Sequence, residues 1–280
     1  MKSPSDTTPA RRRYELVGYF GLCFAIAWAV WIPAGILAPG SSALVIPGAW
    51  APTIAAVLIT WIMEGRSGLS VLFRGLWKWR VKVRYYLFAV FGMLSVGLLS
   101  VGIHVLLGGS PPDPFEIATR FGLPVEQAYL LIAFSPIIFL TTVFVGGPIA
   151  EELGWRGYAQ PRMQTRIGAG WAGLVIGLIW SLWHLPLFYY FPSAVAGLPL
   201  AYYVPLVSAL GVLFAWLYNQ TGGSVLLCIL FHAGVNFSLG VLGAGALSED
   251  GRLATILILS IGVVAVALHL RIRTVEQVPR

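Results

Sequence analysis

The chain has 280 residues, of which 58% are hydrophobic and only 10% are charged, so its composition excludes an ordinary soluble globular domain. The net charge of +7 does not indicate a nucleic-acid partner, because the position of basic residues matters more than their sum in a membrane protein. Cys23 and Cys228 lie in separate apolar segments, which argues against a disulfide framework and against a thiolate metal site. We therefore predict an all-α fold, a polytopic helical membrane protein that contacts membrane lipids and no nucleic acid.

Eight apolar stretches are long enough to cross a bilayer, which takes about 20 residues in a helix. A polar tail precedes them, and the first stretch is too long for the core of a signal peptide. The predicted spans are 14–37, 43–63, 85–107, 128–160, 167–191, 201–219, 224–244 and 253–270. A cytoplasmic amino terminus puts 16 of the 18 lysine and arginine residues on the cytoplasmic side or at the helix ends on that side, leaving only Arg120 and Arg252 outside. We therefore predict a multi-pass protein of the cell membrane with both termini in the cytoplasm.

A basic segment, 64–84, separates the second and third predicted spans. Its apolar residues Leu69, Leu72, Phe73, Leu76 and Trp77 follow helical spacing, while Arg74 and Lys78 lie on another face. This pattern predicts a short amphipathic helix in the membrane interface. The chain then divides into a cytoplasmic tail (1–13), three spans with this basic cytoplasmic loop (14–127), a core of four spans (128–244), and a last span with a cytoplasmic tail (245–280).

Two adjacent carboxylates and an arginine stand in the fourth predicted span. A charged side chain at the centre of a bilayer costs at least about 2.5–3.5 kcal/mol, so such residues usually mark a site. Glu152 and Arg156 are four residues apart and share one helix face, whereas Glu151 points about 100° away. The spacing therefore predicts a Glu152–Arg156 ion pair that leaves Glu151 available for chemistry.

Two later spans each add a histidine deep in an apolar run, His184 and His232, and Asn236 follows His232 by one helical turn. At 1.5 Å per residue, the carboxylates and His232 lie about 12 Å from the cytoplasmic ends of their helices, and His184 lies roughly 20–25 Å from the start of its helix. A tilt or a later helix start would remove this difference in depth. Pro186 predicts a kink next to His184.

These residue types suit the hydrolysis of an amide bond. A carboxylate and an imidazole can activate water, while a second imidazole and a carboxamide can donate to the developing oxyanion. The predicted catalytic set is Glu151, Glu152, His184, His232 and Asn236, supported by Arg156. The side chains of Glu151, His184 and His232 are also ordinary zinc ligands, so the spacing leaves a zinc site and a metal-free site open. A purely structural use of the same residues in helix packing is the third possibility.

Three motifs in order resemble those of the CPBP family, the CAAX proteases and bacteriocin-processing enzymes that are also called the ABI domain. They are Glu151-Glu152-x-x-x-Arg156, Trp180-x-x-x-His184 and His232-x-x-x-Asn236. The family's second motif usually begins with Phe, and Trp180 stands there in this chain. The resemblance covers the 128–244 core, and the count of eight spans agrees with it.

This resemblance implies an intramembrane endopeptidase in which Glu151 and His184 activate the water. It also implies that His232 and Asn236 form the oxyanion site. The family is described both as glutamate-dependent and as metalloprotease, so zinc stays an open cofactor. Eukaryotic members trim prenylated CAAX proteins after the modified cysteine, so the expected substrate is a membrane-associated or lipidated protein or peptide.

Two other functions compete with a protease. Buried Glu, Arg and His also serve as proton relays, which favours an ion-coupled membrane transporter as one alternative. The other is a catalytically silent membrane scaffold of the same fold. No pairing of two halves is visible in the sequence, and each motif position keeps its reactive residue, so hydrolysis is the preferred interpretation.

Overall fold

In the computed structural model the described residues are 9–241, apart from 39–40, 112, 114, 116–123, 128, 146 and 196–197, together with parts of 252–266. These residues form helices and no strand. The helices are α1 (Pro9–Leu37), α2 (Val45–Ala49), α3 (Ala51–Arg74), α4 (Val83–Leu106), α6 (Leu130–Val145), α7 (Pro148–Glu152), a π-helix (Leu153–Ala159), α8 (Gln160–Ile167), α9 (Ala169–Trp183), α10 (Leu185–Tyr190), α11 (Leu200–Gln220) and α12 (Val225–Val241). Short 3₁₀ turns occur at Ser42–Leu44, Gly75–Trp77, Val125–Gln127 and Pro192–Val195.

Six stretches of the described chain are long and apolar enough to cross a membrane. They are Tyr14–Leu37, Val45–Trp77, Val83–Leu106, Ala133–Ile167, Ala169–Tyr190 and Leu200–Gln220, and a shorter apolar helix, Val225–Gly240, stands where the seventh span was predicted. The all-α, multi-pass membrane fold is therefore confirmed. Half of the residues of the predicted eighth span, 253–270, lie outside the described residues, and the cytoplasmic placement of both termini stays a prediction.

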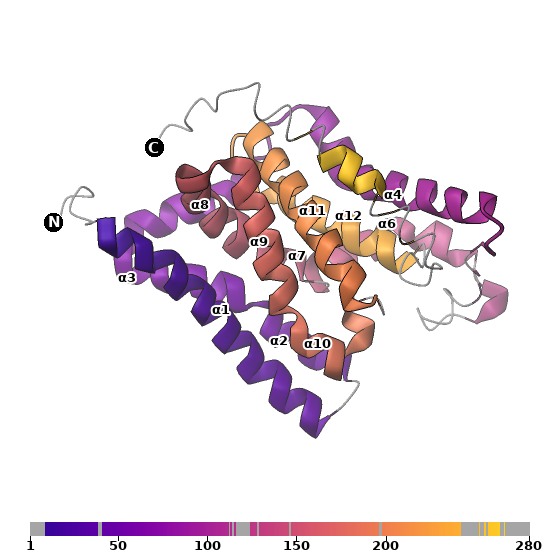
Figure 1. The fold of residues 1–280 in the computed structure, drawn as a ribbon, viewed down its shortest axis with the longest axis horizontal. Coiled ribbons are helices and arrows are strands. Elements are labelled where there is room, and N and C mark those ends of the chain that lie inside the picture. The colour runs from indigo at the N-terminus through magenta and orange to yellow at the C-terminus, as the bar shows by residue number, and fades with distance from the viewer. Residues whose placement is uncertain are drawn as a thin grey trace.

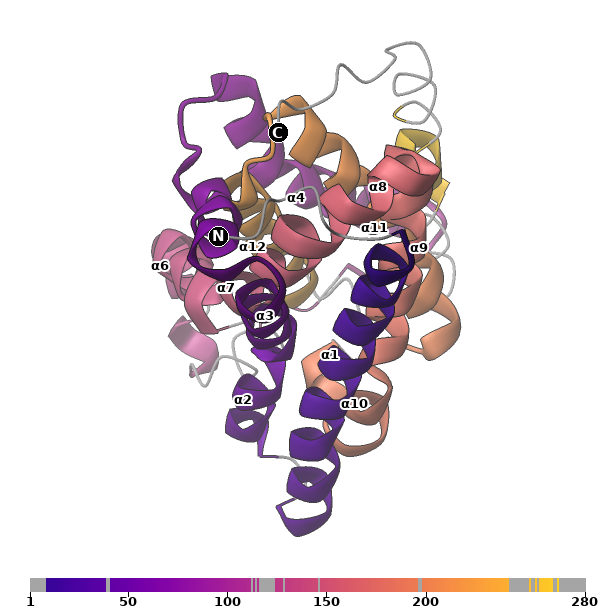
Figure 2. The same ribbon diagram turned by 90° about the vertical axis from the view of Figure 1, so that its left-hand side faces the viewer.

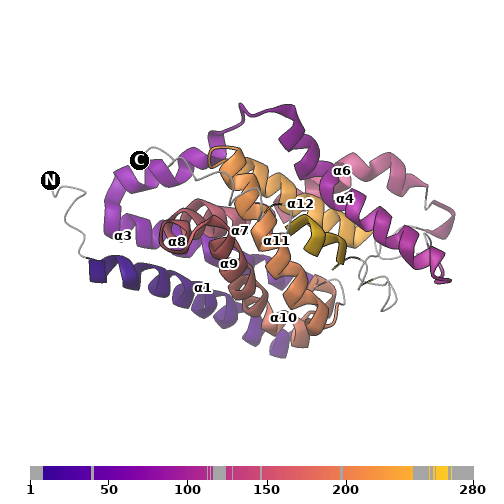
Figure 3. The ribbon, with the colours of Figure 1, turned by 45° about the horizontal axis from the view of Figure 1, so that its top comes forward.

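The helices form two groups on either side of a central pair, α9 and α11. Figures 1 and 3 show α1 and α3 on one side of this pair and α4, α6 and α12 on the other. Between the groups lies α7, which contacts α3, α6 and α12 (Figure 2). The short helix that carries both glutamates is thus enclosed by helices that lie far apart in the sequence.

Small residues bring the central helices close together. A Cβ atom added to Gly173 of α9 would lie 2.5 Å from the carbonyl oxygen of Gly211 in α11, and one added to Gly177 would lie 2.7 Å from that of Val207. On the other side, a Cβ at Gly234 of α12 would lie 2.5 Å from the carbonyl oxygen of Ala89 in α4. Helices in a bilayer associate through such close packing, which here fixes α9, α11 and α12 around the polar residues.

Two glycines interrupt helices, one near the start of the predicted amphipathic segment and the other inside the predicted fourth span. Gly65 has φ 65° and ψ −152° and divides α3, so the residues after it form a separate short helix, as the amphipathic pattern of 64–77 predicts. Figure 3 shows the change of direction within α3. Gly147 has φ 97° and separates α6 from α7, so the predicted single long span is a broken helix. Glycine adopts these positive φ values without the strain that a Cβ would bring.

Candidate active site

The break at Gly147 starts the short helix α7, which ends in the two glutamates, and the chain continues as a π-helix. Such π-helical turns are rare and frequently mark functional sites. Trp155 and Arg156 lie in this π-helix, four residues after Glu151 and Glu152 respectively. Each glutamate therefore meets a different partner on the same short segment.

Glu152 is fully buried and forms the predicted ion pair with Arg156. The Nη1 atom of Arg156 donates to both oxygens of Glu152, at 2.8 and 3.0 Å. The guanidinium carbon of Arg156 lies 3.7 Å from the ring centroid of Phe214 and 4.7 Å from that of Trp180. A charge-assisted hydrogen bond and two aromatic faces stabilise this fully buried guanidinium. The predicted Glu152–Arg156 pair is confirmed.

Glu152 also binds His232, which the spacing did not predict. His232 Nδ1 lies 2.8 Å from Glu152 Oε1. Since a carboxylate accepts, Nδ1 carries the hydrogen, and the Nε2 atom of His232 stays available on the other edge of the ring. Both oxygens of Glu152 accept hydrogen bonds and the side chain is fully buried, so this carboxylate holds Arg156 and His232 in place.

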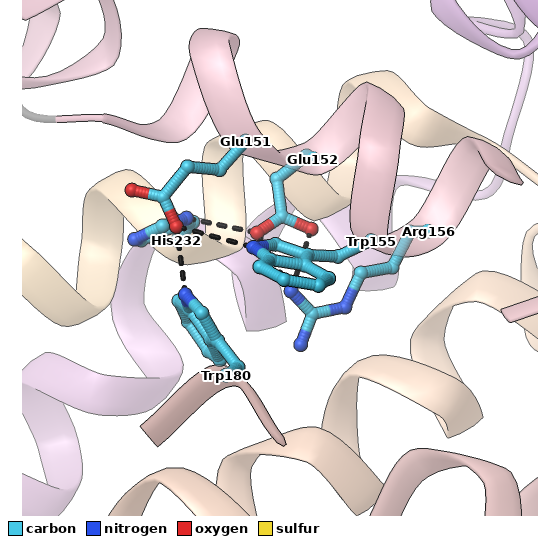
Figure 4. Close-up of polar contacts among 6 residues, drawn as sticks. All are labelled: Glu151, Glu152, Trp155, Arg156, Trp180 and His232. Atoms are coloured by element: carbon cyan, nitrogen blue, oxygen red, sulfur yellow. Dashed lines mark hydrogen bonds and ion pairs between the residues drawn. The ribbon is translucent and has the colours of Figure 1, made fainter. Parts of the chain in front are cut away.

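Glu151 has a different environment, although it is also buried, with 4% of its surface exposed. Trp180 Nε1 donates to its Oε2 atom at 2.7 Å, and Trp155 Nε1 donates to the same oxygen at 3.3 Å. Figure 4 shows the two indole nitrogens directed at this one oxygen, while the other points away from both. Within the described part of the chain, Oε1 of Glu151 accepts no hydrogen bond, so one edge of this carboxylate is free to act.

His184 lies at the break between α9 and α10, two residues before Pro186. The predicted kink is confirmed, because α9 ends at Trp183 and α10 begins at Leu185. His184 Nδ1 lies 2.8 Å from the carbonyl oxygen of Trp180. A carbonyl only accepts, so Nδ1 carries the hydrogen of the neutral ring and Nε2 keeps its lone pair.

Trp180 links the groups that the sequence places on three helices. Its indole holds Glu151, its carbonyl orients His184, and its ring lies edge-on to His232, with centroids 5.0 Å apart. The predicted difference in depth therefore does not separate His184 from the other polar groups. Asn236 is half-buried on α12, one turn after His232 and on the same face.

The sequence analysis missed the two indole donors. Trp155 could have been found, because it stands four residues after Glu151 just as Arg156 stands four residues after Glu152. Trp180 was noted only as the first residue of the second motif, and no local spacing connects it to Glu151, which is 29 residues away. Only the packing of α9 against the π-helix region brings the two together.

Zinc was the open cofactor, with Glu151, His184 and His232 as its expected ligands. No three His, Cys, Asp or Glu side chains converge around a common point in the described part of the chain as a metal ion requires. One oxygen of Glu151 is held by two indoles, and the Trp180 ring lies against both imidazoles, with centroids 5.9 Å from His184 and 5.0 Å from His232. The three side chains as placed do not fit a zinc ion.

Two comparisons with known proteins bear on this site. Residues 133–238 match the model of a family described as type II CAAX prenyl endopeptidase Rce1-like. A curated protein of Methanococcus maripaludis, named CAAX prenyl protease 2, is 24% identical over 270 residues, which cover 92% of this chain and 94% of that protein. The matched range lies inside the predicted 128–244 core and contains every residue of the three motifs.

Proposed function

We propose that this chain, whose membership of the CPBP family the matched model and the curated relative both support, cuts a peptide bond with a water molecule activated by Glu151 and His184. An intramembrane endopeptidase of the CAAX type is the activity that these two similarities support. The roles of individual residues are our proposal, argued from the contacts described above.

The difference between the two adjacent carboxylates carries this proposal. Glu152 uses both oxygens to hold Arg156 and His232, whereas Glu151 uses only Oε2, which two indoles grip. A general base needs a fixed orientation and a free lone pair within reach of the proton that it takes. Glu151 Oε1 meets both needs, and Glu152 acts as a positioning residue.

His184 complements Glu151, because its Nε2 atom keeps a lone pair when the ring is neutral. In the first step Glu151 takes one proton from the water while His184 Nε2 accepts a hydrogen bond from the other hydrogen. The water oxygen then bonds to the scissile carbonyl carbon, whose oxygen becomes an oxyanion. In the second step Glu151 returns its proton to the leaving nitrogen as the C–N bond breaks, so all atoms and charges balance.

His232 and Asn236 stabilise the oxyanion from α12. His232 has already spent its Nδ1 hydrogen on Glu152, so it donates through Nε2 only as an imidazolium. Asn236, one turn further along α12, can donate through the NH₂ group of its carboxamide.

We further propose that the substrate is a lipidated protein or peptide, with cleavage on the carboxyl side of a prenylated cysteine. The name of the curated relative supports this substrate class. A lipid chain would bring the scissile bond to a site enclosed by membrane helices. We also propose that the protein lies in the cell membrane with both termini in the cytoplasm, as the distribution of basic residues favours.

The test uses the purified full chain in detergent, a set of peptides with and without a farnesylated cysteine, and mass spectrometry of the products. The expected result is a cut after the farnesylated cysteine that is absent from Glu151→Gln and from His184→Ala, while both variants accumulate and stay folded. Cleavage by Glu151→Gln at the native rate would refute the proposed base. Proton flux in vesicles without any cleavage would favour the transporter.

A further inference from the structure

The phenol of Tyr203 is a buried polar group that the proposed mechanism does not use. Tyr203 lies in the first turn of α11 and is 9% exposed. Its ring packs edge-on against His184, with centroids 5.6 Å apart and an interplanar angle of 70°. Its other neighbour is Phe188 of α10, at 5.1 Å and 83°. The ring is thus fixed beside a residue of the water-activating pair.

The hydroxyl group of Tyr203 forms no hydrogen bond with any described residue, although buried tyrosines usually find a partner for this group. The ring contact with His184 places Tyr203 in the immediate surroundings of the proposed water-activating pair. A buried phenol that lies beside His184 and has no hydrogen-bond partner among the described residues is available to a substrate.

We propose that Tyr203 donates its phenolic hydrogen to the carbonyl oxygen of the scissile bond and so stabilises the oxyanion. This inference rests on the proposed function and adds a third donor to His232 and Asn236. The phenol donates in its neutral form, so it adds no charge to a cluster that already holds two carboxylates. Because the hydrogen bond strengthens as the oxygen becomes negative, it accelerates the chemical step rather than substrate binding.

A packing role for Tyr203 makes a different prediction, because the ring alone could hold His184. Tyr203→Phe keeps the ring against His184 and Phe188 and removes only the O–H. An oxyanion donor predicts that kcat of Tyr203→Phe falls by about 100- to 1,000-fold with KM nearly unchanged. A packing role predicts that Tyr203→Phe keeps the native kcat.

The experiment measures kcat and KM of the full chain in detergent on a quenched farnesylated peptide that the native protein cuts. Tyr189→Phe is the matched control, because Tyr189 belongs to α10 and is 80% exposed. Thermal unfolding of each variant shows whether the fold is intact. Native kcat in Tyr203→Phe would overturn the proposal, and so would an equal loss in Tyr189→Phe.

A substrate change tests the hydrogen bond itself. Sulfur accepts hydrogen bonds weakly, so replacing the scissile carbonyl oxygen by sulfur slows the native protein and slows Tyr203→Phe less, because that variant has already lost the donor. An equal slowing of both proteins would contradict a contact with this oxygen. If native protein cuts and Glu151→Gln does not, the proposed function stands whatever Tyr203→Phe shows. If native protein cuts no peptide, both proposals fall.

Discussion

Trp180→Phe isolates the contact that orients the proposed base. The change removes the indole N–H that donates to Oε2 of Glu151 at 2.7 Å and keeps an aromatic ring against His232. It also keeps the backbone carbonyl that binds Nδ1 of His184. The perturbation therefore acts on Glu151 and leaves the orientation of His184 intact.

The size of the effect follows from the contact that is lost. A hydrogen bond to a charged group contributes about 1.5–3 kcal/mol. The second donor, Trp155, is at 3.3 Å and cannot replace a bond of 2.7 Å. If the whole contribution is needed to hold Glu151 in the transition state, kcat falls by about 10- to 150-fold, since 1.36 kcal/mol is a factor of ten in rate.

The assay compares kcat and thermal unfolding of Trp180→Phe with those of Trp183→Phe. Trp183 is the matched control, because it is fully buried and its indole donates at 3.2 Å to the backbone carbonyl of Cys23, away from Glu151. We expect both variants to lose some stability and only Trp180→Phe to lose most of its kcat. A kcat of Trp180→Phe within twofold of native, or an equal loss in both variants, would refute the orientation of Glu151 by Trp180.

Three further changes test other parts of the site. Glu152→Gln leaves Arg156 buried without its carboxylate and should lower the free energy of unfolding by about 3–5 kcal/mol. The double variant Glu152→Gln with Arg156→Gln should recover part of this loss in a denaturation assay. Strictly additive losses of the two single variants would contradict the pair. Gly147→Ala should abolish turnover, because the backbone of Gly147 has φ 97° and the new Cβ would collide with Oε1 of Glu151. Gly168→Ala is the control that should keep kcat, because Gly168 also has a positive φ, 81°, but a Cβ there would meet only open space. Dialysis against a strong chelator should leave turnover unchanged, and restoration of lost activity by one equivalent of zinc would show that Glu151 takes part in a metal site.

The membrane fold and the local pairing of charges follow from the order of residues along the chain. Long apolar stretches must become helices in a bilayer, because no water is present there to satisfy the backbone, so spans such as Tyr14–Leu37 follow from composition. Gly65 and Pro186 mark breaks through backbone rules that act within a few residues. The Glu152–Arg156 pair follows from helical spacing in the same way.

Contacts between helices that are distant in the chain determine which carboxylate is free and which is held. Trp180 and His232 come from α9 and α12, and the chain separates them from the glutamates by 29 and 80 residues. Their approach depends on how closely glycine-bearing helices pack, which no periodicity within one segment encodes. The same packing brings Tyr203, which belongs to none of the three motifs, into contact with His184.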